Sequence, residues 1–249
     1  MEMKSITMLL FLLVASSCMK NKSLLVIGHR GAMGHETENT IPSIKKALEL
    51  DVDMIEIDVF KIASGEIVVF HDDAIDRLTD GVGDIEEYTW SQLQKVTVKG
   101  NHKIPLLTEV IHVIDRKVPL NIELKAAGTA KDVNGIIAAY LKEGWVLDDF
   151  LISSFNWNEL KVMRMENARI KIAVLIENDD PREALPLAKE LKAVAINPDF
   201  EKLTLTIADE IKAAGFKIYP WTVNEPEAID EMIQIGVDGV FTNFPERIK

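Results

Sequence analysis

The chain has 249 residues, of which 47% are hydrophobic and 27% are charged. This composition is sufficient for a full-sized core, and it excludes a disordered chain, a collagen-like chain and a polytopic membrane protein. A formal net charge of -12 argues against a nucleic-acid partner, because phosphates repel an acidic surface.

The first 17 residues have the layout of a lipoprotein-type signal peptide. Lys4 precedes an apolar run from Ile6 to Ala15, which is shorter than the roughly 20 residues needed to cross a bilayer. Small residues stand directly before Cys18, as in the lipobox of bacterial lipoproteins, in which the cysteine is acylated. We therefore expect residues 1–17 to be removed from an exported protein of the bacterial cell envelope, facing the periplasm or the cell surface. A lipid on Cys18, rather than a transmembrane helix, would hold it at the membrane. The alternative is an N-terminal helix with a buried thiol.

Short β-branched runs alternate with longer amphipathic runs along the rest of the chain. The predicted strands are Leu24–Gly28, Met54–Phe60, Leu120–Leu124, Phe150–Ser153, Ile172–Ile176, Ala193–Ile196, Lys217–Trp221 and Gly239–Thr242. The predicted helices are Ile41–Leu50, Leu107–Ile114, Val133–Glu143, Trp157–Asn167, Pro181–Leu191, Leu203–Ala214 and Pro226–Ile235. The 232 residues that follow residue 17, divided by eight, give 29 residues for each unit. This spacing favours an α/β fold of the (β/α)8 TIM-barrel type over a doubly wound open sheet.

The second unit is longer than the others. A hairpin is predicted over Lys61–His71, turning at Ser64-Gly65, and a polar stretch follows it. We interpret about residues 72–105 as a small insertion after the second strand, above the mouth of a single barrel domain that covers residues 18–249.

Polar residues gather where the predicted strands end, and the active sites of such barrels are built from these strand ends. Gly28-His29-Arg30-Gly31 closes the first strand, Glu56 and Asp58 stand late in the second, and Glu123 and Lys125 close the third. The later strand ends contribute Ser154, Asn197, Thr222, Asn224 and Asn243.

The carboxylates among these residues predict a metal site. Glu56 and Asp58 are two residues apart, so both side chains leave the same face of their strand, and Glu123 and Lys125 repeat this spacing. Three carboxylates that converge on the barrel axis would repel one another unless a divalent cation lay among them. All-oxygen ligation suits Mg²⁺, Ca²⁺ or Mn²⁺ better than zinc. The alternatives are a solvated edge for the first pair and a structural ion pair for the second.

Two histidines lie in positions that suit catalysis. His29 stands between glycines that let a ligand approach closely, and His71 ends the hairpin strand that returns to the mouth. A buried core histidine is the alternative for His29. Three carboxylates, a divalent cation, Arg30 and Lys125 leave a formal charge of +1, which suits a monoanion such as a phosphodiester. The remaining histidines are expected on the surface or on helices, and they are His35, His102 and His112.

Taken together, these residues resemble the glycerophosphodiester phosphodiesterase family. The resemblance rests on motifs that occur in family order from about residue 24 onward. They are Gly28-His29-Arg30-Gly31, Glu38-Asn39-Thr40, Glu56-Ile57-Asp58, His71-Asp72, Leu78-Thr79-Asp80-Gly81, Ile104-Pro105-Leu106, Glu123-Leu124-Lys125, Trp221-Thr222-Val223-Asn224 and Gly236-Val237-Asp238-Gly239. The resemblance implies a (β/α)8 barrel with a small insertion after the second strand.

The resemblance also implies the role of each site residue. Glu56, Asp58 and Glu123 would bind one divalent cation, His29 and His71 would form the acid–base pair, and Arg30 and Lys125 would hold the phosphate. Glu38, Asn39, Trp221 and Asn224 would make outer-shell or substrate contacts. Two departures from the family pattern are Thr37, where a proline is common, and Asn243, where an aspartate is common. We expect neither of them to touch the catalytic set.

The implied reaction is the hydrolysis of a small-molecule glycerophosphodiester to glycerol phosphate and an alcohol. We hypothesise that His29 is the base and His71 the acid. The resemblance also allows the substrate's own glycerol 2-hydroxyl to act as the first nucleophile. The aromatic residues Phe155, Phe200 and Trp221 are interpreted equally well as packing at the mouth or as a platform for substrate. Two rivals remain at this point: an anchored binding protein that does not cleave its ligand, and a two-metal enzyme in which both histidines are ligands.

Overall fold

The computed structural model describes residues 24–178 and 180–248. Within these residues, eight parallel strands form the wall of a nearly closed barrel. They are β1 (Leu25–Gly28), β2 (Met54–Lys61), β4 (Leu120–Leu124), β5 (Phe150–Ser154), β6 (Lys171–Ile176), β7 (Ala195–Pro198), β8 (Lys217–Ile218) and β9 (Gly239–Thr242). The predicted signal peptide, residues 1–17, and Cys18 lie outside the described residues.

The strand order confirms the predicted (β/α)8 barrel. Neighbouring strands run β8-β7-β6-β5-β4-β2-β1-β9, and each ladder along this path is parallel. The ends of the path approach each other, because Asp238 N donates to Ile218 O at 3.0 Å and Phe241 N donates to Pro220 O at 3.0 Å. Strand β8 is shorter than predicted, since Pro198 on the neighbouring strand β7 has no N–H with which to continue the ladder beyond Ile218.

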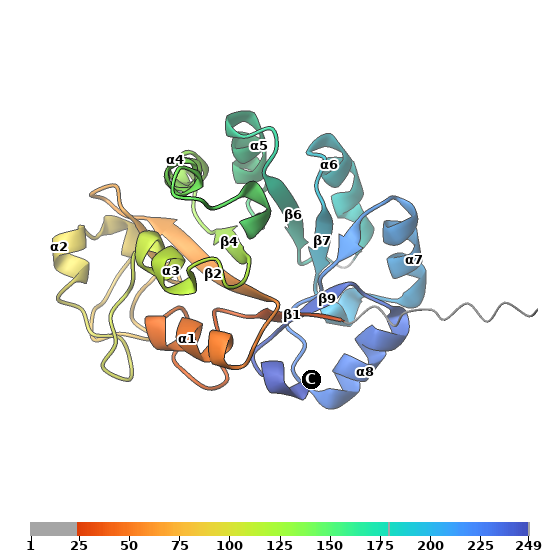
Figure 1. Cartoon of the computed structure of the whole chain (residues 1–249), viewed down its shortest axis with the longest axis horizontal. Coiled ribbons are helices and arrows are strands. Elements are labelled where there is room, and N and C mark those ends of the chain that lie inside the picture. Colours follow the sequence, from red (N-terminus) through yellow and green to blue (C-terminus); the bar gives the residue numbers. More distant parts are fainter. Residues whose placement is uncertain (1–23, 179, 249) are drawn as a thin grey trace, which may run out of the picture.

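Helices alternate with the strands and cover the outside of the barrel (Figure 1). They are α1 (Ile41–Glu49), α3 (Leu107–Ile114), α4 (Thr129–Leu141), α5 (Trp157–Glu166), α6 (Leu185–Glu190), α7 (Leu205–Ala213) and α8 (Pro226–Ile235). Helix α4 begins four residues before the predicted start, because the Glu159 carboxylate accepts hydrogen bonds from Gly128 N and Ala130 N. The predicted helix Pro181–Leu191 divides into a 3-10 turn, Pro181–Ala184, and α6, since Pro186 cannot donate to the preceding turn.

Side chains alternate across the barrel wall, as the period of a strand requires. Ile55 and Ile57 on β2 point outward and belong to the main hydrophobic core between the strands and the helices. A separate apolar cluster fills the interior, and its buried members are Ile27, Met54, Leu151, Ala173, Ala195, Tyr219 and Phe241. These residues fill the barrel interior below the carboxyl ends of the strands. The inward-facing polar side chains therefore lie above them, at the carboxyl ends.

The chain between β2 and α3 extends from one side of the barrel, at the left of Figure 1. Strand β3 (Ile67–Val69) pairs antiparallel with β2, so the predicted hairpin is confirmed. A 3-10 turn, Ile85–Glu87, and the short helix α2 (Trp90–Leu93) follow. The segment packs around its own cluster of buried residues, which includes Phe60, Phe70 and Ile75. It is therefore held by an independent core while remaining continuous with β2.

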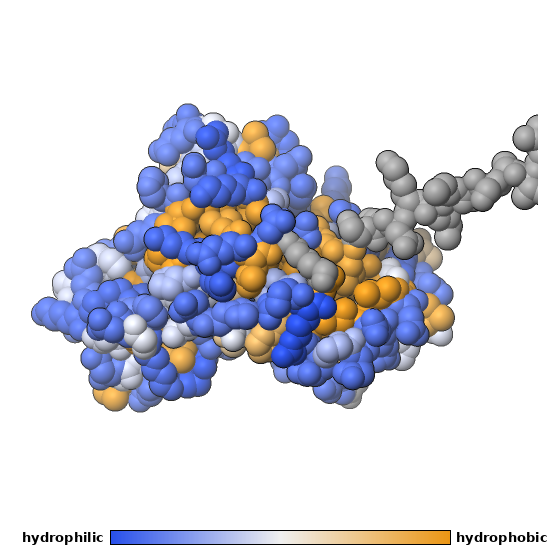
Figure 2. Space-filling model, turned by 60° about the horizontal axis from the view of Figure 1, so that its bottom comes forward, coloured by the Kyte–Doolittle hydropathy of each residue, from blue (hydrophilic) through white to orange (hydrophobic). Residues whose placement is uncertain are grey.

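The outer surface is largely hydrophilic on the face shown in Figure 2, where hydrophobic residues gather along a band across the middle. In the part of the chain that the structure describes, no helix combines the length and the apolar character needed to cross a membrane.

Candidate active site

Three carboxylates converge at the carboxyl end of the barrel. Asp58 on β2 is in register with Glu123 on β4, and Glu56 lies two residues before Asp58 on the same face. Their exposed fractions are 2% for Glu56, 1% for Asp58 and 9% for Glu123. One ligand oxygen from each lies within 4.8 Å of the others. The burial of all three excludes a solvated edge and brings the predicted ligand set together.

The electrostatics of this cluster suit a cation. Burial, reinforced by repulsion from Asp58 and Glu123, raises the pKa of Glu56 well above its usual value. Burial and Asp58 also raise the pKa of Glu123 to about 7. The Oε1 atom of Glu56 is buried and has no hydrogen-bond partner among the described residues. A divalent cation would supply the missing partner for this oxygen and would relieve the repulsion.

Arg30 and Lys125 place two positive charges beside the carboxylates. Lys125 Nζ lies 2.9 Å from Glu123 Oε1 and 3.8 Å from Asp58 Oδ1. The structural ion pair considered for Glu123 and Lys125 is therefore present, but it is part of the larger cluster. Arg30 N donates to Glu56 Oε2 at 2.9 Å, and Arg30 Nε lies 3.4 Å from Asp58 Oδ2. Both of these basic side chains line the cavity and can contact an anionic ligand there.

The loop after β1 makes its tight turn around a glycine. Gly31 has a φ of +84°, and a Cβ on it would lie 2.5 Å from Ser43 Oγ. This conformation lets Ser43 Oγ donate to Arg30 O at 2.8 Å. The turn thereby fixes Arg30 against the barrel, which explains why the motif needs glycine after the arginine.

His29 lies at the end of β1 and is held by the barrel itself. Its backbone N donates to Thr242 O at 3.0 Å, and its Nδ1 lies 2.7 Å from Asn243 Oδ1. Asn224 Oδ1 in turn accepts from Asn243 N at 2.8 Å. Burial, reinforced by Arg30, lowers the pKa of His29 to about 4. The ring is therefore neutral at pH 7, and the amide oxygen fixes the proton on Nδ1 and leaves the Nε2 lone pair free.

The position of Asn243 corrects one expectation. We expected Asn243 not to touch the catalytic set, yet it makes the side-chain hydrogen bond to His29. The two residues are 214 positions apart, and they meet because β1 and β9 are neighbours in the closing barrel. Asn224 accepts the hydrogen bond from Asn243 N and is absent from the lining of the cavity, so the geometry favours the outer-shell contact over the substrate contact among the two predicted for it.

His71 follows β3 and has a different kind of partner. Its Nδ1 lies 2.7 Å from Asp72 Oδ1, and Asp72 also accepts hydrogen bonds from Arg77. Although burial opposes the change, the hydrogen bonds from Arg77 and His71 lower the pKa of Asp72 to about 2. The carboxylate is therefore ionised, and it orients His71 with a proton on Nδ1.

The two outer contacts predicted at the start of α1 are present. Asn39 Nδ2 donates to Asp58 Oδ2 at 2.8 Å, and Glu38 Oε1 accepts from Arg30 Nη1 at 2.7 Å. Glu38 also accepts two hydrogen bonds from Arg77, a residue that the sequence motifs did not single out. No periodicity marks Arg77, because it lies in an irregular stretch between β3 and the first 3-10 turn.

A cavity of about 450 Å³ joins these groups. Its lining consists of His29, Arg30, Glu56, His71, Glu123, Lys125, Phe155, Leu175, Glu177, Trp221, Thr222 and Phe241. Phe155 and Trp221 face each other edge-on across 5.3 Å at the rim, whereas Phe200 packs against the main core and does not line the cavity. Glu177 lines the cavity and is not among the predicted site residues, although its place directly after a predicted strand is a usable signal.

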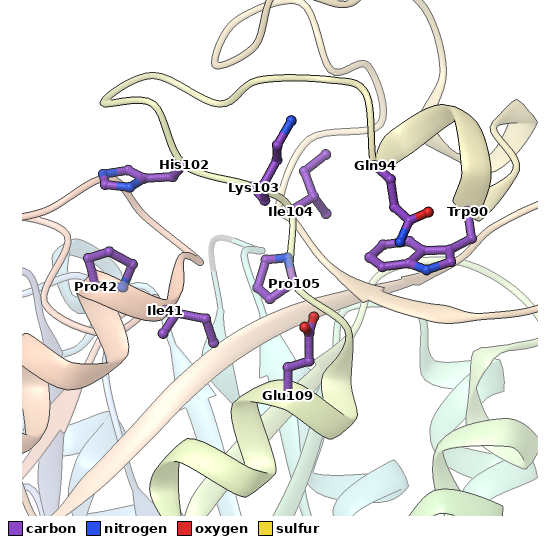
Figure 3. A pocket seen from close by; sticks show the side chains of 9 residues that line it. All are labelled: Ile41, Pro42, Trp90, Gln94, His102, Lys103, Ile104, Pro105 and Glu109. Carbon is purple, nitrogen blue, oxygen red and sulfur yellow. The ribbon is translucent and has the colours of Figure 1, made fainter.

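A second cavity, of about 380 Å³, lies between α1, α2 and α3. Figure 3 shows Ile41 and Pro42 on one side of it and Trp90 and Gln94 on the other. It is separate from the first cavity, because none of the predicted metal ligands or acid–base histidines lines it.

Comparisons with known proteins identify the family and the fold. Residues 29–247 match the sequence profile of the glycerophosphoryl diester phosphodiesterase family. The sequence is 32% identical over 233 residues to a glycerophosphodiester phosphodiesterase of Caldanaerobacter subterraneus subsp. tengcongensis, covering 90% of this chain and 96% of that protein. The fold is similar, with a TM-score of 0.83 and 30% identity, to an Oleispira antarctica phosphodiesterase solved with its product sn-glycerol-3-phosphate, covering 90% of this chain and 94% of that one. A glycerophosphoryl diester phosphodiesterase structure from Silicibacter pomeroyi has a TM-score of 0.81 and 22% identity, covering 91% and 92%, and supports the fold alone.

Proposed function

Because the chain belongs to the glycerophosphoryl diester phosphodiesterase family and is a phosphoric diester hydrolase, we propose that it hydrolyses glycerophosphodiesters with one divalent cation and two histidines. The products are glycerol phosphate and a free alcohol. One observation carries this proposal: a single cavity is lined by Glu56, Glu123, two basic side chains and two histidines with different partners, and a ligand oxygen of Asp58 lies within 4.8 Å of those of the two glutamates. The sn-glycerol-3-phosphate named as the product of the Oleispira antarctica phosphodiesterase supports glycerol phosphate as the product here.

The cation site consists of Glu56, Asp58 and Glu123. The unpartnered Oε1 of Glu56 and the all-oxygen donor set fit Mg²⁺ or Ca²⁺, with Mn²⁺ also compatible. A divalent cation bound there would polarise a nonbridging phosphate oxygen of the substrate. Asn39 and Arg30 hold Asp58 in place from the side of α1.

Arg30 and Lys125 would bind the phosphate as electrostatic clamps. The three carboxylates, a divalent cation and these two side chains sum to a formal charge of +1. Glu177, which also lines the cavity, subtracts one charge, and the proton that His71 would donate adds one. The site then keeps a formal charge of +1, which matches the single negative charge of a phosphodiester. The same match disfavours a phosphomonoester, which carries more negative charge at neutral pH.

The two histidines would move the two protons that hydrolysis requires. The free Nε2 of neutral His29 would accept the proton of the attacking hydroxyl, which belongs to water or to the glycerol 2-hydroxyl of the substrate. Attack by the 2-hydroxyl would release the alcohol and leave a cyclic phosphodiester, which water would open to glycerol phosphate in a second step. As the phosphorus–oxygen bond to the alcohol breaks, His71 would donate a proton from Nε2 to the departing oxygen. General acid–base catalysis of this kind contributes about 10²- to 10⁴-fold for each group.

A two-metal centre that uses the histidines as ligands is less well supported. Among the described side chains, the group whose ligand atoms lie within 4.8 Å of one another consists of the three carboxylates and neither histidine. The Nδ1 atom of each histidine is already engaged, by Asn243 in one case and by Asp72 in the other. These contacts favour an acid–base pair.

Metal removal tests the proposed function most directly. We expect a chelator to abolish hydrolysis of a panel of glycerophosphodiesters, and Mg²⁺ or Ca²⁺ to restore it. Calorimetry of Glu56→Gln, Asp58→Asn and Glu123→Gln should show metal affinity reduced by at least the roughly 10- to 100-fold that is usual for outer-shell substitutions. Asp148→Asn serves as the control, because this carboxylate is 80% exposed and lies outside the cavity. Full activity in the metal-free protein would contradict the assignment.

We also propose that the mature protein is an exported lipoprotein anchored through Cys18. The proposal rests on the charged start, the short apolar run and the small residues before this cysteine. Cells that make the full-length chain should hold it in the membrane fraction, and a radiolabelled fatty acid should be incorporated into it. Labelling should disappear in Cys18→Ala, and unchanged labelling of that variant would contradict the anchor.

A further inference from the structure

Arg77 joins two carboxylates at the edge of the cavity. Its Nη1 and Nη2 donate to Glu38 Oε2 and Oε1 at 3.0 and 2.8 Å, and its Nη2 also donates to Asp72 Oδ1 at 3.0 Å. Its Nε donates to the other oxygen of Asp72. All three nitrogens of one guanidinium are therefore engaged, and the two carboxylates are held on adjacent edges of the same plane.

Each of these carboxylates holds a different group of the proposed mechanism. Glu38 Oε1 accepts from Arg30 Nη1 at 2.7 Å, so it orients a phosphate clamp. Asp72 Oδ1 lies 2.7 Å from His71 Nδ1, so it orients the proposed acid. The result is a continuous row of hydrogen-bonded side chains, in which the order is His71, Asp72, Arg77, Glu38 and Arg30.

Arg77 stands at the centre of this row, because it donates hydrogen bonds to both Glu38 and Asp72. Glu38 is buried, and although burial opposes the change, the hydrogen bonds from Arg77 and the charge of Arg30 keep its pKa below the ordinary value. Without Arg77, Asp72 would lose the contacts that fix it beside His71, and the histidine would be free to turn. A lysine could not replace the arginine, because one ammonium cannot span four oxygens in a plane.

We propose that Arg77 is a positioning residue for hydrolysis, which sets the acid His71 and the phosphate clamp Arg30 at a fixed separation. This inference rests on the proposed function, because it assigns Arg77 a task in that reaction. Arg77 touches neither substrate nor cation in this role, since it is absent from the lining of the cavity. It acts through two carboxylates, and the segment after β3 thereby becomes part of the active site.

Arg182 provides a matched control within the same chain. Its Nε and Nη2 donate to Asp180, and its Nη1 lies 3.1 Å from Glu210 Oε1, so it also bridges two carboxylates. The exposed fractions of the two arginine side chains are 48% for Arg77 and 39% for Arg182. Arg182 lies outside the cavity, so the two sites share local geometry and differ in their connection to the active site.

The test compares Arg77→Met, Arg77→Lys and Arg182→Met on two esters of glycerol phosphate. One ester carries choline, whose alkoxide must be protonated to leave, and the other carries p-nitrophenol, which leaves without a proton. We expect both Arg77 variants to lose about 10- to 100-fold in kcat on the choline ester and clearly less on the aryl ester. KM should rise on both esters, because Arg30 loses its support. Arg182→Met should stay within about twofold of the wild type on both.

A double-mutant cycle separates positioning from general damage. In a His71→Ala background, Arg77→Met should cost much less kcat on the choline ester than it costs alone, because the group that it positions is already missing. An undiminished loss in that background, or equal losses on the two esters, would overturn the positioning role even if the wild type behaves as proposed. If the wild type cleaved neither ester, the proposed function would be wrong, and this inference with it.

Discussion

The two histidines of the cavity are held by two different regions of the molecule. His29 lies at the end of β1, and its backbone and side chain are fixed by residues next to β9, with the neutral amide of Asn243 as partner. His71 lies beyond β3, and its partner is the ionised carboxylate of Asp72. The barrel wall therefore positions one histidine, and the side-chain network of the segment after β3 positions the other.

The difference indicates how one residue type can serve two opposite tasks. A neutral amide beside a half-buried ring leaves the imidazole uncharged, and an uncharged imidazole can accept a proton. A carboxylate is a partner suited to an imidazolium, and an imidazolium can donate a proton. On this ground we propose His29 as the base and His71 as the acid, and the predictions below test that contrast.

The largest effect is expected from removing each histidine in turn. His29→Ala should lose about 10²- to 10⁴-fold in kcat on alkyl and aryl phosphodiesters alike, because either substrate still needs a base. His71→Ala should lose a similar factor on a choline or ethanolamine ester and far less on a p-nitrophenyl ester, whose leaving group needs no proton. Steady-state kinetics on the two kinds of ester measures the difference.

His112→Ala is the matched control for these variants, because His112 is exposed on α3 and outside the cavity. It should keep wild-type rates on both esters. Equal losses on the two esters in His71→Ala would reject its role as the acid, and the reverse pattern would exchange the two assignments.

A smaller effect is expected from giving His29 a charged partner. Asn243→Asp places a carboxylate against Nδ1, which should raise the pKa of His29 from about 4 by about one unit or more. The base is active only when unprotonated, so the acidic limb of the pH profile of kcat/KM should move to higher pH. Activity near pH 5 should fall more than activity at pH 8.

Asn101→Asp controls for the added charge, because Asn101 is exposed and does not line the cavity. Its pH profile should match that of the wild type. A profile of Asn243→Asp that drops by the same factor at every pH would mean that the partner of His29 affects geometry and not protonation.

The smallest effect concerns two carboxylates, Glu56 and Glu123, which line the same cavity as the two histidines. The folded, cation-free protein keeps protons on Glu56 and Glu123 at pH values where the unfolded chain has lost them, since both pKa values are raised. Stability of that form should therefore fall as pH rises from about 4.5 to about 7. Mg²⁺ at about a hundredfold excess over its Kd should add about 2.7 kcal/mol, or about 5–10 °C in Tm, at pH 8.

At pH 5 the same Mg²⁺ concentration should raise Tm by less, because the cation must displace protons from the carboxylates. Thermal melting at both pH values, with and without Mg²⁺, checks the prediction. A shift that is equal at the two pH values, or larger at pH 5, would show that these carboxylates do not hold the cation.

Much of the site follows from local patterns in the chain. The two-residue spacing of Glu56 and Asp58 on an apolar strand forces both carboxylates to one face, and their burial is the outcome. The hairpin that carries His71 follows from an apolar run after Ser64-Gly65. The start of α4 differs from the prediction because the carboxylate that accepts from the backbone N–H groups of Gly128 and Ala130 belongs to Glu159, a residue on α5, and this contact has no local signal in the sequence.

The sequence by itself determined the alternation of strands and helices, the barrel, and the residue types at the strand ends, because the period of a strand or a helix is a local property of the backbone. Only the tertiary structure decided which partners the side chains of the candidate site meet. Asn243 reaches His29 because β9 closes the barrel against β1, and Arg77 reaches Glu38 because the segment after β3 folds back over the start of α1. Such contacts join residues far apart in the chain, and their identity depends on the closure of the whole fold.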